Sequence, residues 1–263
     1  MDVRIIALFL MGALFGYIGG YTGIGGAPFL VSFSVIVLGL SQHEAQGTIL
    51  AVMLGPMSLF SVIVMWDRVK ILKWYILSCV LSYAVFSYFG AAGAYALSEV
   101  SLKLLFGFLL LSIGIINLYI SKNLTENDQP LHPGKITVSG GTIPANIYTI
   151  TIFGIIAGLL GGFFGIGAGV LMMPVFIGLF GIHKDDARAL SLAILLPPVS
   201  FGAVIKYYSA DAIDLKIALI VFIAYFLTNY FGAKKGKRHT SGKFRKYFGM
   251  ILIFLGLSYL ILL

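Results

Sequence analysis

Long apolar runs recur along nearly the whole chain, and they restrict it to folds that span a lipid bilayer. Of its 263 residues, 59% are hydrophobic and 11% are charged, and the mean hydropathy is +1.01. Soluble domains carry about 25% charged residues, so this chain lacks the polar surface needed to face water on all sides. A transmembrane barrel would need segments that alternate apolar and polar residues, and the sequence shows no such alternation. It therefore predicts an all-α polytopic membrane protein.

The net charge of +8 is concentrated in one part of the chain. Seven of the 18 Lys and Arg residues lie between positions 234 and 246. A basic cluster between two apolar runs is typical of a cytoplasmic loop, which can also contact anionic lipid. We therefore expect the lipid bilayer, and no nucleic acid, as a partner. The single cysteine, Cys79, lies inside an apolar run, so we expect neither a disulfide nor a cysteine metal site.

The chain repeats itself at a constant offset of 142 residues, without insertion. The offset pairs Gly16, Gly19, Gly20, Gly23 and Gly25 with Gly158, Gly161, Gly162, Gly165 and Gly167, and Pro56 and Ser58 with Pro198 and Ser200. A register that holds along both halves and involves Gly and Pro is hard to obtain by chance. The sequence thus predicts a first transmembrane repeat over 1–121, a polar linker over 122–142 and a second transmembrane repeat over 143–263.

Each repeat contains five apolar segments, so about ten are expected in all. They cover 4–21, 27–40, 45–66, 71–97 and 101–120 in the first repeat, and 145–163, 169–182, 188–208, 213–233 and 244–262 in the second. A full crossing needs about 20 residues. Segments 27–40 and 169–182 are shorter and each follows a glycine-rich stretch, so both are expected to be short or re-entrant.

The basic loops favour opposite orientations of the two repeats. The loops 234–246 and 67–73 carry the strongest clusters of Lys and Arg, which predicts that both are cytoplasmic. These loops are not equivalent under the 142-residue offset. If both are inside, the repeats are inverted, each crosses an odd number of times, and both termini lie outside. A parallel repeat with four crossings per half is the alternative, and it would place one basic loop outside.

The doubled glycine stretches are the best candidates for a binding site. Glycine permits helix breaks, and irregular backbone at membrane depth is tolerated where protein or a water-filled cavity satisfies it. Two helix starts that meet near midplane would present N–H groups to an anion. The candidate residues are Gly23, Gly25, Gly26 and Ala27 in the first repeat and Gly165, Gly167, Ala168 and Gly169 in the second. Tight helix packing through small residues is the alternative interpretation.

Four hydroxyl side chains follow the short segments and complete the candidate set, namely Thr48, Ser58, Ser191 and Ser200. Pro56 and Pro198 lie just before two of them, and a hydroxyl there can serve either a freed carbonyl or a substrate. The charged residues at positions 43, 44, 185, 186 and 188 lie at predicted helix starts, where capping is the simplest interpretation. The sequence shows no spacing of residues that is typical of a nucleophile–base pair or of a metal site. We therefore expect no enzyme activity, no catalytic residue, no metal and no cofactor.

These residues resemble the sulfite exporter TauE/SafE family. The resemblance is carried by Gly19-Gly20-x-x-Gly23-Ile24-Gly25-Gly26 with Ala45-Gln46-Gly47-Thr48, and by Gly161-Gly162-x-x-Gly165-Ile166-Gly167-Ala168-Gly169 with Pro174 and Gly181. It covers nearly the whole chain. It implies a secondary transporter of the cell membrane whose partner is a small sulfur-containing anion such as sulfite, thiosulfate or an organosulfonate.

The chain departs from the family pattern in ways that make the two repeats unequal. Ser32 stands where the second copy has Pro174, and Leu190 stands where the first copy has Thr48. The resemblance fixes neither the anion nor the direction of transport. An anion channel, or a transporter of another small solute with the same fold, is the alternative function, and a homo-oligomer remains open.

Overall fold

The computed structural model describes residues 3–123, 136, 145–167, 169–236 and 242–261. These residues are almost entirely helical and form no β-strand. The first half contains α1 (Val3–Thr22), α2 (Ala27–Ile36), α3 (Gln42–Val52), α4 (Leu59–Val64), α5 (Trp66–Ile71), α6 (Lys73–Tyr95) and α7 (Glu99–Asn123). The second half contains α8 (Ile147–Phe164), α9 (Gly169–Gly178), α10 (Lys184–Ile194), α11 (Phe201–Tyr208), α12 (Leu215–Gly236) and α13 (Gly242–Ile261). Of the predicted linker, only Lys122, Asn123 and Ile136 are among the described residues.

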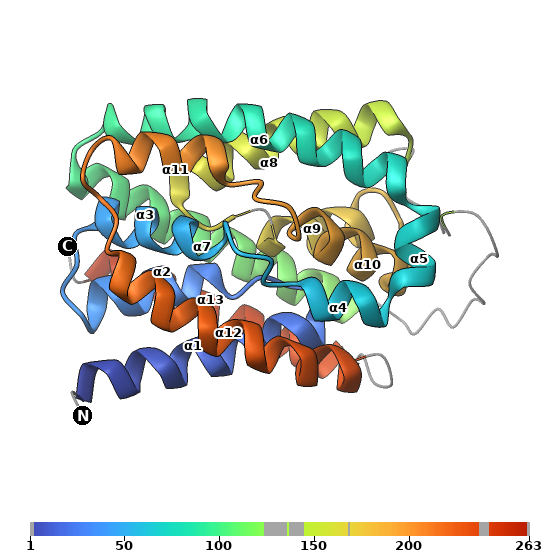
Figure 1. Cartoon of the computed structure of the whole chain (residues 1–263), viewed down its shortest axis with the longest axis horizontal. Helices are drawn as coiled ribbons and strands as arrows, with labels where there is room; N and C mark the ends of the chain where they lie inside the picture. Colours follow the sequence, from blue (N-terminus) through green and yellow to red (C-terminus); the bar gives the residue numbers. More distant parts are fainter. Residues whose placement is uncertain (1–2, 124–135, 137–144, 168, 237–241, 262–263) are drawn as a thin grey trace.

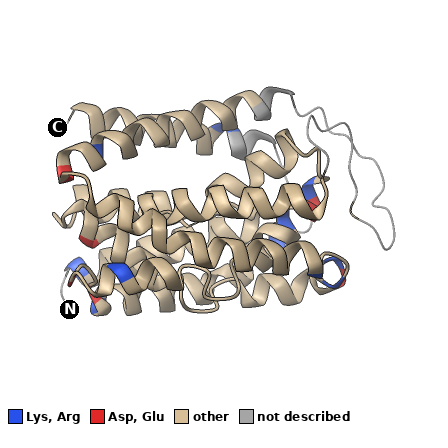
Figure 2. Ribbon diagram, turned by 90° about the horizontal axis from the view of Figure 1, so that it is seen from above, with Lys and Arg blue, Asp and Glu red and all other residues tan. Residues whose placement is uncertain are grey.

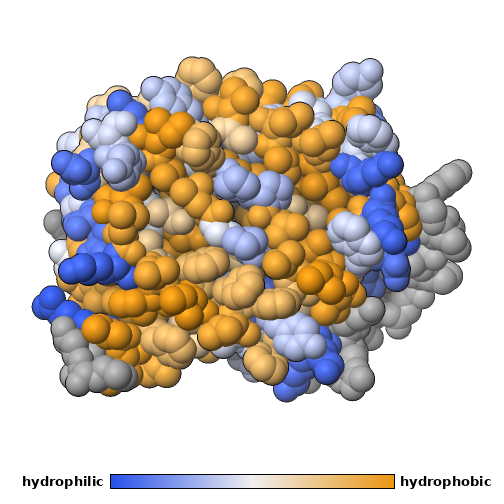
Figure 3. Space-filling model, viewed as in Figure 1, coloured by the Kyte–Doolittle hydropathy of each residue, from blue (hydrophilic) through white to orange (hydrophobic). Residues whose placement is uncertain are grey.

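The surface of the molecule matches a lipid bilayer. Among the described residues, five helices are long and apolar enough to cross a membrane: α1, α6, α7, α8 and α12. Apolar side chains form a broad band across the middle of the molecule, and hydrophilic residues gather at its two ends (Figure 3). The Lys, Arg, Asp and Glu residues lie mostly at the same two ends (Figure 2). The chain is therefore a multi-pass α-helical membrane protein.

The long helices pack in pairs that join the two halves. α1 lies along α12, α6 along α8, and α7 along α13. Glycines at the crossings let the backbones approach closely. A Cβ atom at Gly16 would overlap the carbonyl oxygen of Tyr225, and one at Gly158 would lie 2.7 Å from the carbonyl oxygen of Tyr83. Each half thus supplies helices to the interior of the other.

Two predicted spans are divided in the structure. The segments 45–66 and 188–208, each predicted as one apolar segment with a proline inside it, form α3 followed by α4 and α10 followed by α11. The interruptions fall at Pro56 and at Pro197-Pro198. Proline removes a backbone donor and clashes with the preceding turn, and it disfavours helical backbone at the residue before it. Another difference is that α5 occupies most of the loop expected over 67–73.

The helix directions place the chain ends and the basic segments. In Figure 1, α1 runs from left to right, whereas α8 begins at the right and runs to the left. α1 begins and α13 ends at the same end of the molecule. α5 lies at the opposite end, where α12 also ends. Positions 237–241 of the basic cluster lie outside the described residues.

Candidate functional site

Both glycine-rich stretches interrupt the helices, as predicted, with non-helical backbone at 23–26 in the first and, among the described residues, at 165–167 in the second. α1 ends at Thr22 and α2 begins at Ala27, while α8 ends at Phe164 and α9 begins at Gly169. Three glycines adopt the left-handed conformation that glycine favours, with φ of +74° at Gly23, +67° at Gly165 and +62° at Gly167. Ala168, the remaining candidate in the second stretch, lies outside the described residues.

The two breaks touch each other through the main chain. A Cβ atom at Gly25 would lie 3.5 Å from Gly169 Cα, and one at Gly169 would lie 3.0 Å from Gly25 Cα. The candidate residues of both breaks are buried wherever the structure describes them. The N–H groups of Gly25, Ala27, Gly167 and Gly169 form no hydrogen bond within the described part of the chain. Buried backbone donors are nearly always paired, so donors without a protein acceptor are candidates for binding a ligand.

Arg188 of α10 packs against the first break. Its side chain is among the largest that are fully buried, with 1% exposed, and its Cγ would lie 2.8 Å from a Cβ at Gly23. Nη2 donates to the carbonyl oxygens of Gly20 at 2.6 Å and Ala233 at 3.1 Å. Nε and Nη1 have no hydrogen-bond partner within the described residues. We expected Arg188 only as a charge at a helix start, so its position in the interior was missed.

Gln46 of α3 packs against the second break in the same way. It is fully buried, and a Cβ at Gly165 would overlap its side chain. Oε1 accepts a hydrogen bond from the Tyr207 hydroxyl at 2.8 Å, while Nε2 has no partner within the described residues. Positions 46 and 188 are separated by the 142-residue offset. A polar residue at both positions was the sequence signal that could have identified this pair.

The four candidate hydroxyl groups are all buried, and one of them reaches a break. Ser191 donates to the carbonyl oxygen of Gly23 at 2.8 Å. Ser58 donates to the carbonyl oxygen of Leu192 at 2.7 Å, and Ser200 donates to that of Leu50 at 3.0 Å. Thr48 Oγ1 accepts a hydrogen bond from the N–H of Asp214 at 2.9 Å. In this conformation, Thr48, Ser58 and Ser200 therefore hold other parts of the backbone.

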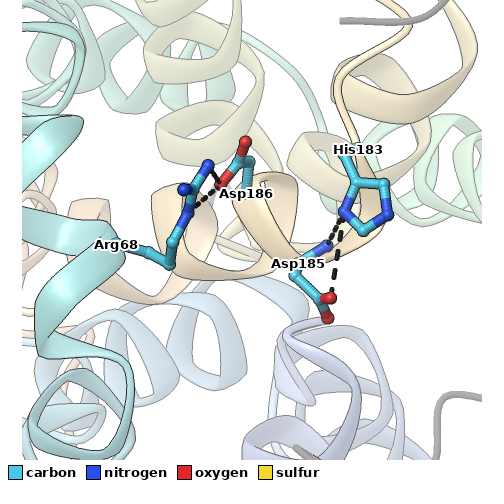
Figure 4. A network of polar contacts seen from close by, with 4 residues as sticks. All are labelled: Arg68, His183, Asp185 and Asp186. Carbon is cyan, nitrogen blue, oxygen red and sulfur yellow. Dashed lines mark hydrogen bonds and ion pairs between the residues drawn. The ribbon is translucent and has the colours of Figure 1, made fainter. Parts of the chain in front are cut away.

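The predicted capping role of the charged residues at the start of α10 agrees with the structure only in part. His183 is the N-cap, and its Nδ1 accepts a hydrogen bond from the N–H of Asp185 at 3.3 Å. Asp186 lies in the first turn but is fully buried and pairs with Arg68 of α5, with 2.6 Å between Nε and Oδ1 (Figure 4). No pattern in the sequence indicated this ion pair, which joins α5 to α10.

Two cavities in the described part of the chain lie away from the breaks. One of about 390 Å³ is bounded mainly by apolar side chains of α8, of α9 and of the two residues after α9. Another of about 360 Å³ lies among α3, α11 and α12. Neither is lined by a candidate binding residue. In the described part of the chain, no group of three or more His, Cys, Asp or Glu side chains is placed to hold a metal ion. The breaks are enclosed by protein in this conformation.

The fold is that of a polytopic α-helical membrane protein in which two buried helix breaks touch each other. The sequence pattern of the sulfite exporter TauE/SafE family matches residues 8–259. The chain belongs to this family. It is also similar to a probable membrane transporter protein of Methanocaldococcus jannaschii, with 26% identity over 278 aligned residues that cover 97% of this chain and 94% of that protein. No solved structure matches. The chain is therefore a membrane transporter.

Proposed function

We propose that the protein is a secondary transporter that moves small sulfur-containing anions, of the sulfite, thiosulfate or organosulfonate type, across the cell membrane. The observation that carries the proposal is the contact between the two breaks, where four buried N–H groups have no partner in the described residues. Backbone donors at helix starts bind anions without a charged side chain. Transporters place such interrupted helices around the substrate near midplane.

The site that we propose contains the candidate residues of both breaks and the four hydroxyl groups. Ser191 already donates to the first break. Ser58, Ser200 and Thr48 hold backbone groups elsewhere in the enclosed conformation. They would contact a substrate only after the halves move relative to each other. The site residues are Gly23, Gly25, Gly26, Ala27, Thr48, Ser58, Gly165, Gly167, Ala168, Gly169, Ser191 and Ser200.

We further propose that the two halves are inverted copies, with both termini outside. The contacts of Ser58 with Leu192 and of Ser200 with Leu50 exchange with each other under the 142-residue offset. The contacts of Gly23 with Arg188 and of Gly165 with Gln46 do the same. Contacts that exchange in this way support an approximate two-fold relation. Opposite directions of α1 and α8 support its inversion, and motion of one half against the other would alternate access.

Transport into proteoliposomes tests the function. Purified full-length protein should take up labelled sulfite or thiosulfate with saturation, and preloaded vesicles should show counterflow. Gly25→Leu should abolish uptake because its side chain would fill the contact with Gly169. Gly39→Asn is the matched control. Gly39 also has positive φ (+72°), but a Cβ atom there would have no other atom within 4 Å, and Asn tolerates that conformation.

Two results would contradict the proposal. Currents at channel rates without counterflow would favour an anion channel. Stabilisation of the protein by a neutral solute, with none by sulfite, thiosulfate or taurine-like sulfonates in a thermal-shift panel, would remove the anion assignment. Uptake by Gly25→Leu at the wild-type rate would indicate that the breaks serve helix packing and do not bind the substrate.

A further inference from the structure

We propose that the Arg188 guanidinium at the first break, with the Gln46 amide at the second, binds the transported anion and limits the substrates to compact oxyanions. The inference rests on the proposed function and identifies Arg188 as the positively charged group of the anion site. Each side chain lies against the left-handed glycine of the other half's break, Arg188 at Gly23 and Gln46 at Gly165. Each keeps N–H donors without a partner in the described residues.

Arg188 is a buried cation whose hydrogen bonds are incomplete. A guanidinium has five N–H donors, and only Nη2 is engaged, by the carbonyl oxygens of Gly20 and Ala233. Both carbonyls lie in the last turns of their helices, α1 and α12, where the helix ends carry partial negative charge. These contacts hold the side chain in place and leave one N–H on Nε and two on Nη1 without a partner in the described residues.

The acidic groups nearest in sequence form no ion pair with Arg188. Asp186 pairs with Arg68. Asp185 lies 3.8 Å from His183 Nδ1, and its charge acts on Arg188 only from outside pairing distance. No ion pair to Arg188 occurs within the described residues. Burying a charge without a counter-ion is costly. A buried arginine of this kind is stabilised when a ligand of opposite charge binds to it. A bound anion would supply both the negative charge and the hydrogen-bond acceptors that the guanidinium lacks.

Gln46 adds a neutral donor in the second half. Its Oε1 is fixed by the Tyr207 hydroxyl, which orients the amide and leaves Nε2 as the unengaged end among the described residues. A cation on one side and an amide on the other suit an anion with several acceptor oxygens. A neutral solute would leave the Arg188 charge uncompensated, and a halide ion offers a single acceptor atom for donors on two sides.

The test is binding of sodium sulfite and sodium thiosulfate to detergent-purified full-length protein, by calorimetry and thermal shift at constant ionic strength. Arg188→Gln should weaken affinity by about 10- to 100-fold, the usual effect of losing charged hydrogen bonds. Gln46→Met should weaken it by roughly 3- to 10-fold, as for one neutral hydrogen bond. Wild-type affinity should be higher for either oxyanion than for chloride.

Matched controls separate the site from general effects of charge and burial. Gln42→Met removes another fully buried amide without side-chain partners in the described residues, one turn earlier on α3. Lys206→Gln removes one positive charge from α11, where the ammonium lies over the Tyr95 ring. Neither should change oxyanion affinity by more than about two-fold, a difference well below the loss of one hydrogen bond. If Arg188→Gln does not yield folded protein, Arg188→Lys keeps the charge and should still bind about 10-fold more weakly, since it loses the planar donor set.

The outcomes distinguish this inference from the proposed function. If wild type binds oxyanions and the Arg188 variants bind them equally well, the assignment of Arg188 is overturned while the anion transporter stands. If wild type binds a neutral solute and no oxyanion, the function and the inference fail together. A loss in Gln42→Met as large as in Gln46→Met would also overturn the role given to Gln46.

Discussion

At the scale of single residues, glycines set how closely the helices of the two halves approach. In a bilayer, helices gain little from apolar contact alone, so close packing of small residues has a large share in their association. Gly90 of α6 lies against α8, and a Cβ there would overlap the carbonyl oxygen of Leu159. Gly232 of α12 has the same relation to Tyr17 of α1. These positions allow no side chain without separating the helices.

Gly90→Ala should destabilise the protein by about 1–3 kcal/mol, because its methyl group would meet backbone that cannot move aside. Gly93→Ala, on the same helix, is the control, since its Cβ would lie 3.4 Å from the Phe163 ring, at the edge of ordinary contact. Thermal unfolding in detergent compares the two variants. Equal stability of both would show that the crossing tolerates a wider separation than the contacts indicate.

The ion pair of Arg68 with Asp186 should respond unequally to removal of its two members. The Asp186 side chain is fully buried, whereas that of Arg68 is 16% exposed. Arg68→Gln removes the Arg68 charge from a buried carboxylate, and breaking a buried ion pair typically costs about 3–5 kcal/mol. Asp186→Asn should cost less because the Arg68 side chain can extend towards water.

Unfolding of both single variants and the double variant measures this asymmetry. Asp185→Asn serves as the control because its carboxylate is 33% exposed and faces His183. A larger loss in Asp186→Asn than in Arg68→Gln would contradict the burial argument.

At the scale of elements, the short helices α3, α4, α10 and α11 hold the interior together across the two halves. Each pair is separated at a proline, and the serine that follows is the N-cap residue of the next helix and bonds to the opposite half. Ser58 reaches Leu192 on α10, and Ser200 reaches Leu50 on α3. The interruption therefore lets a side chain bind a carbonyl that a continuous helix would have kept for itself.

Ser58→Ala and Ser200→Ala should each lower the free energy of unfolding by about 1 kcal/mol, the net value of a buried hydrogen bond. The double variant should lose roughly the sum if the two bonds act independently. Ser112→Ala is the control because this exposed hydroxyl bonds to Phe108 in its own helix. A loss in Ser112→Ala equal to the others would attribute the effect to the serine itself.

The sequence predicts the long helices well and the interior poorly. Apolar length alone places α1, α6, α7, α8, α12 and α13 within a few residues, since a bilayer crossing depends on length and hydropathy. The division at Pro56 could not be predicted, because the outcome of a proline inside a span depends on whether neighbouring helices satisfy the freed backbone groups. Arg188 could not be placed, since the carbonyls that hold it, of Gly20 and Ala233, come from helices remote in sequence.

At the scale of the whole molecule, the offset of 142 residues makes a prediction about sidedness. Asp67 and Ser209 are equivalent under the offset and both are exposed. If the halves are inverted, cysteines at these two positions face opposite sides of the membrane. In a Cys79→Ala background, Ser209→Cys should react with an impermeant maleimide added outside intact cells, whereas Asp67→Cys should react only after the membrane is opened.

Lys70→Cys, also exposed on α5, should behave like Asp67→Cys and serves as its control. Labelling of Asp67→Cys and Ser209→Cys from the same side would favour the parallel arrangement with four crossings per half. The positive charges of Arg68, Lys70 and Lys73 would then not mark a cytoplasmic segment.

The pairing of α1 with α12 has a consequence for how the chain is made. α1 ends at Thr22 and α12 begins at Leu215, so the ribosome must add the intervening residues before the two can meet. At about 5–20 residues per second, this takes roughly 10–40 seconds. Throughout that interval, the surface of α1 that contains Gly16 and later packs on α12 lies against lipid or insertion machinery. The order of synthesis therefore requires α1 to remain in the bilayer without its partner α12 until the second half has been inserted.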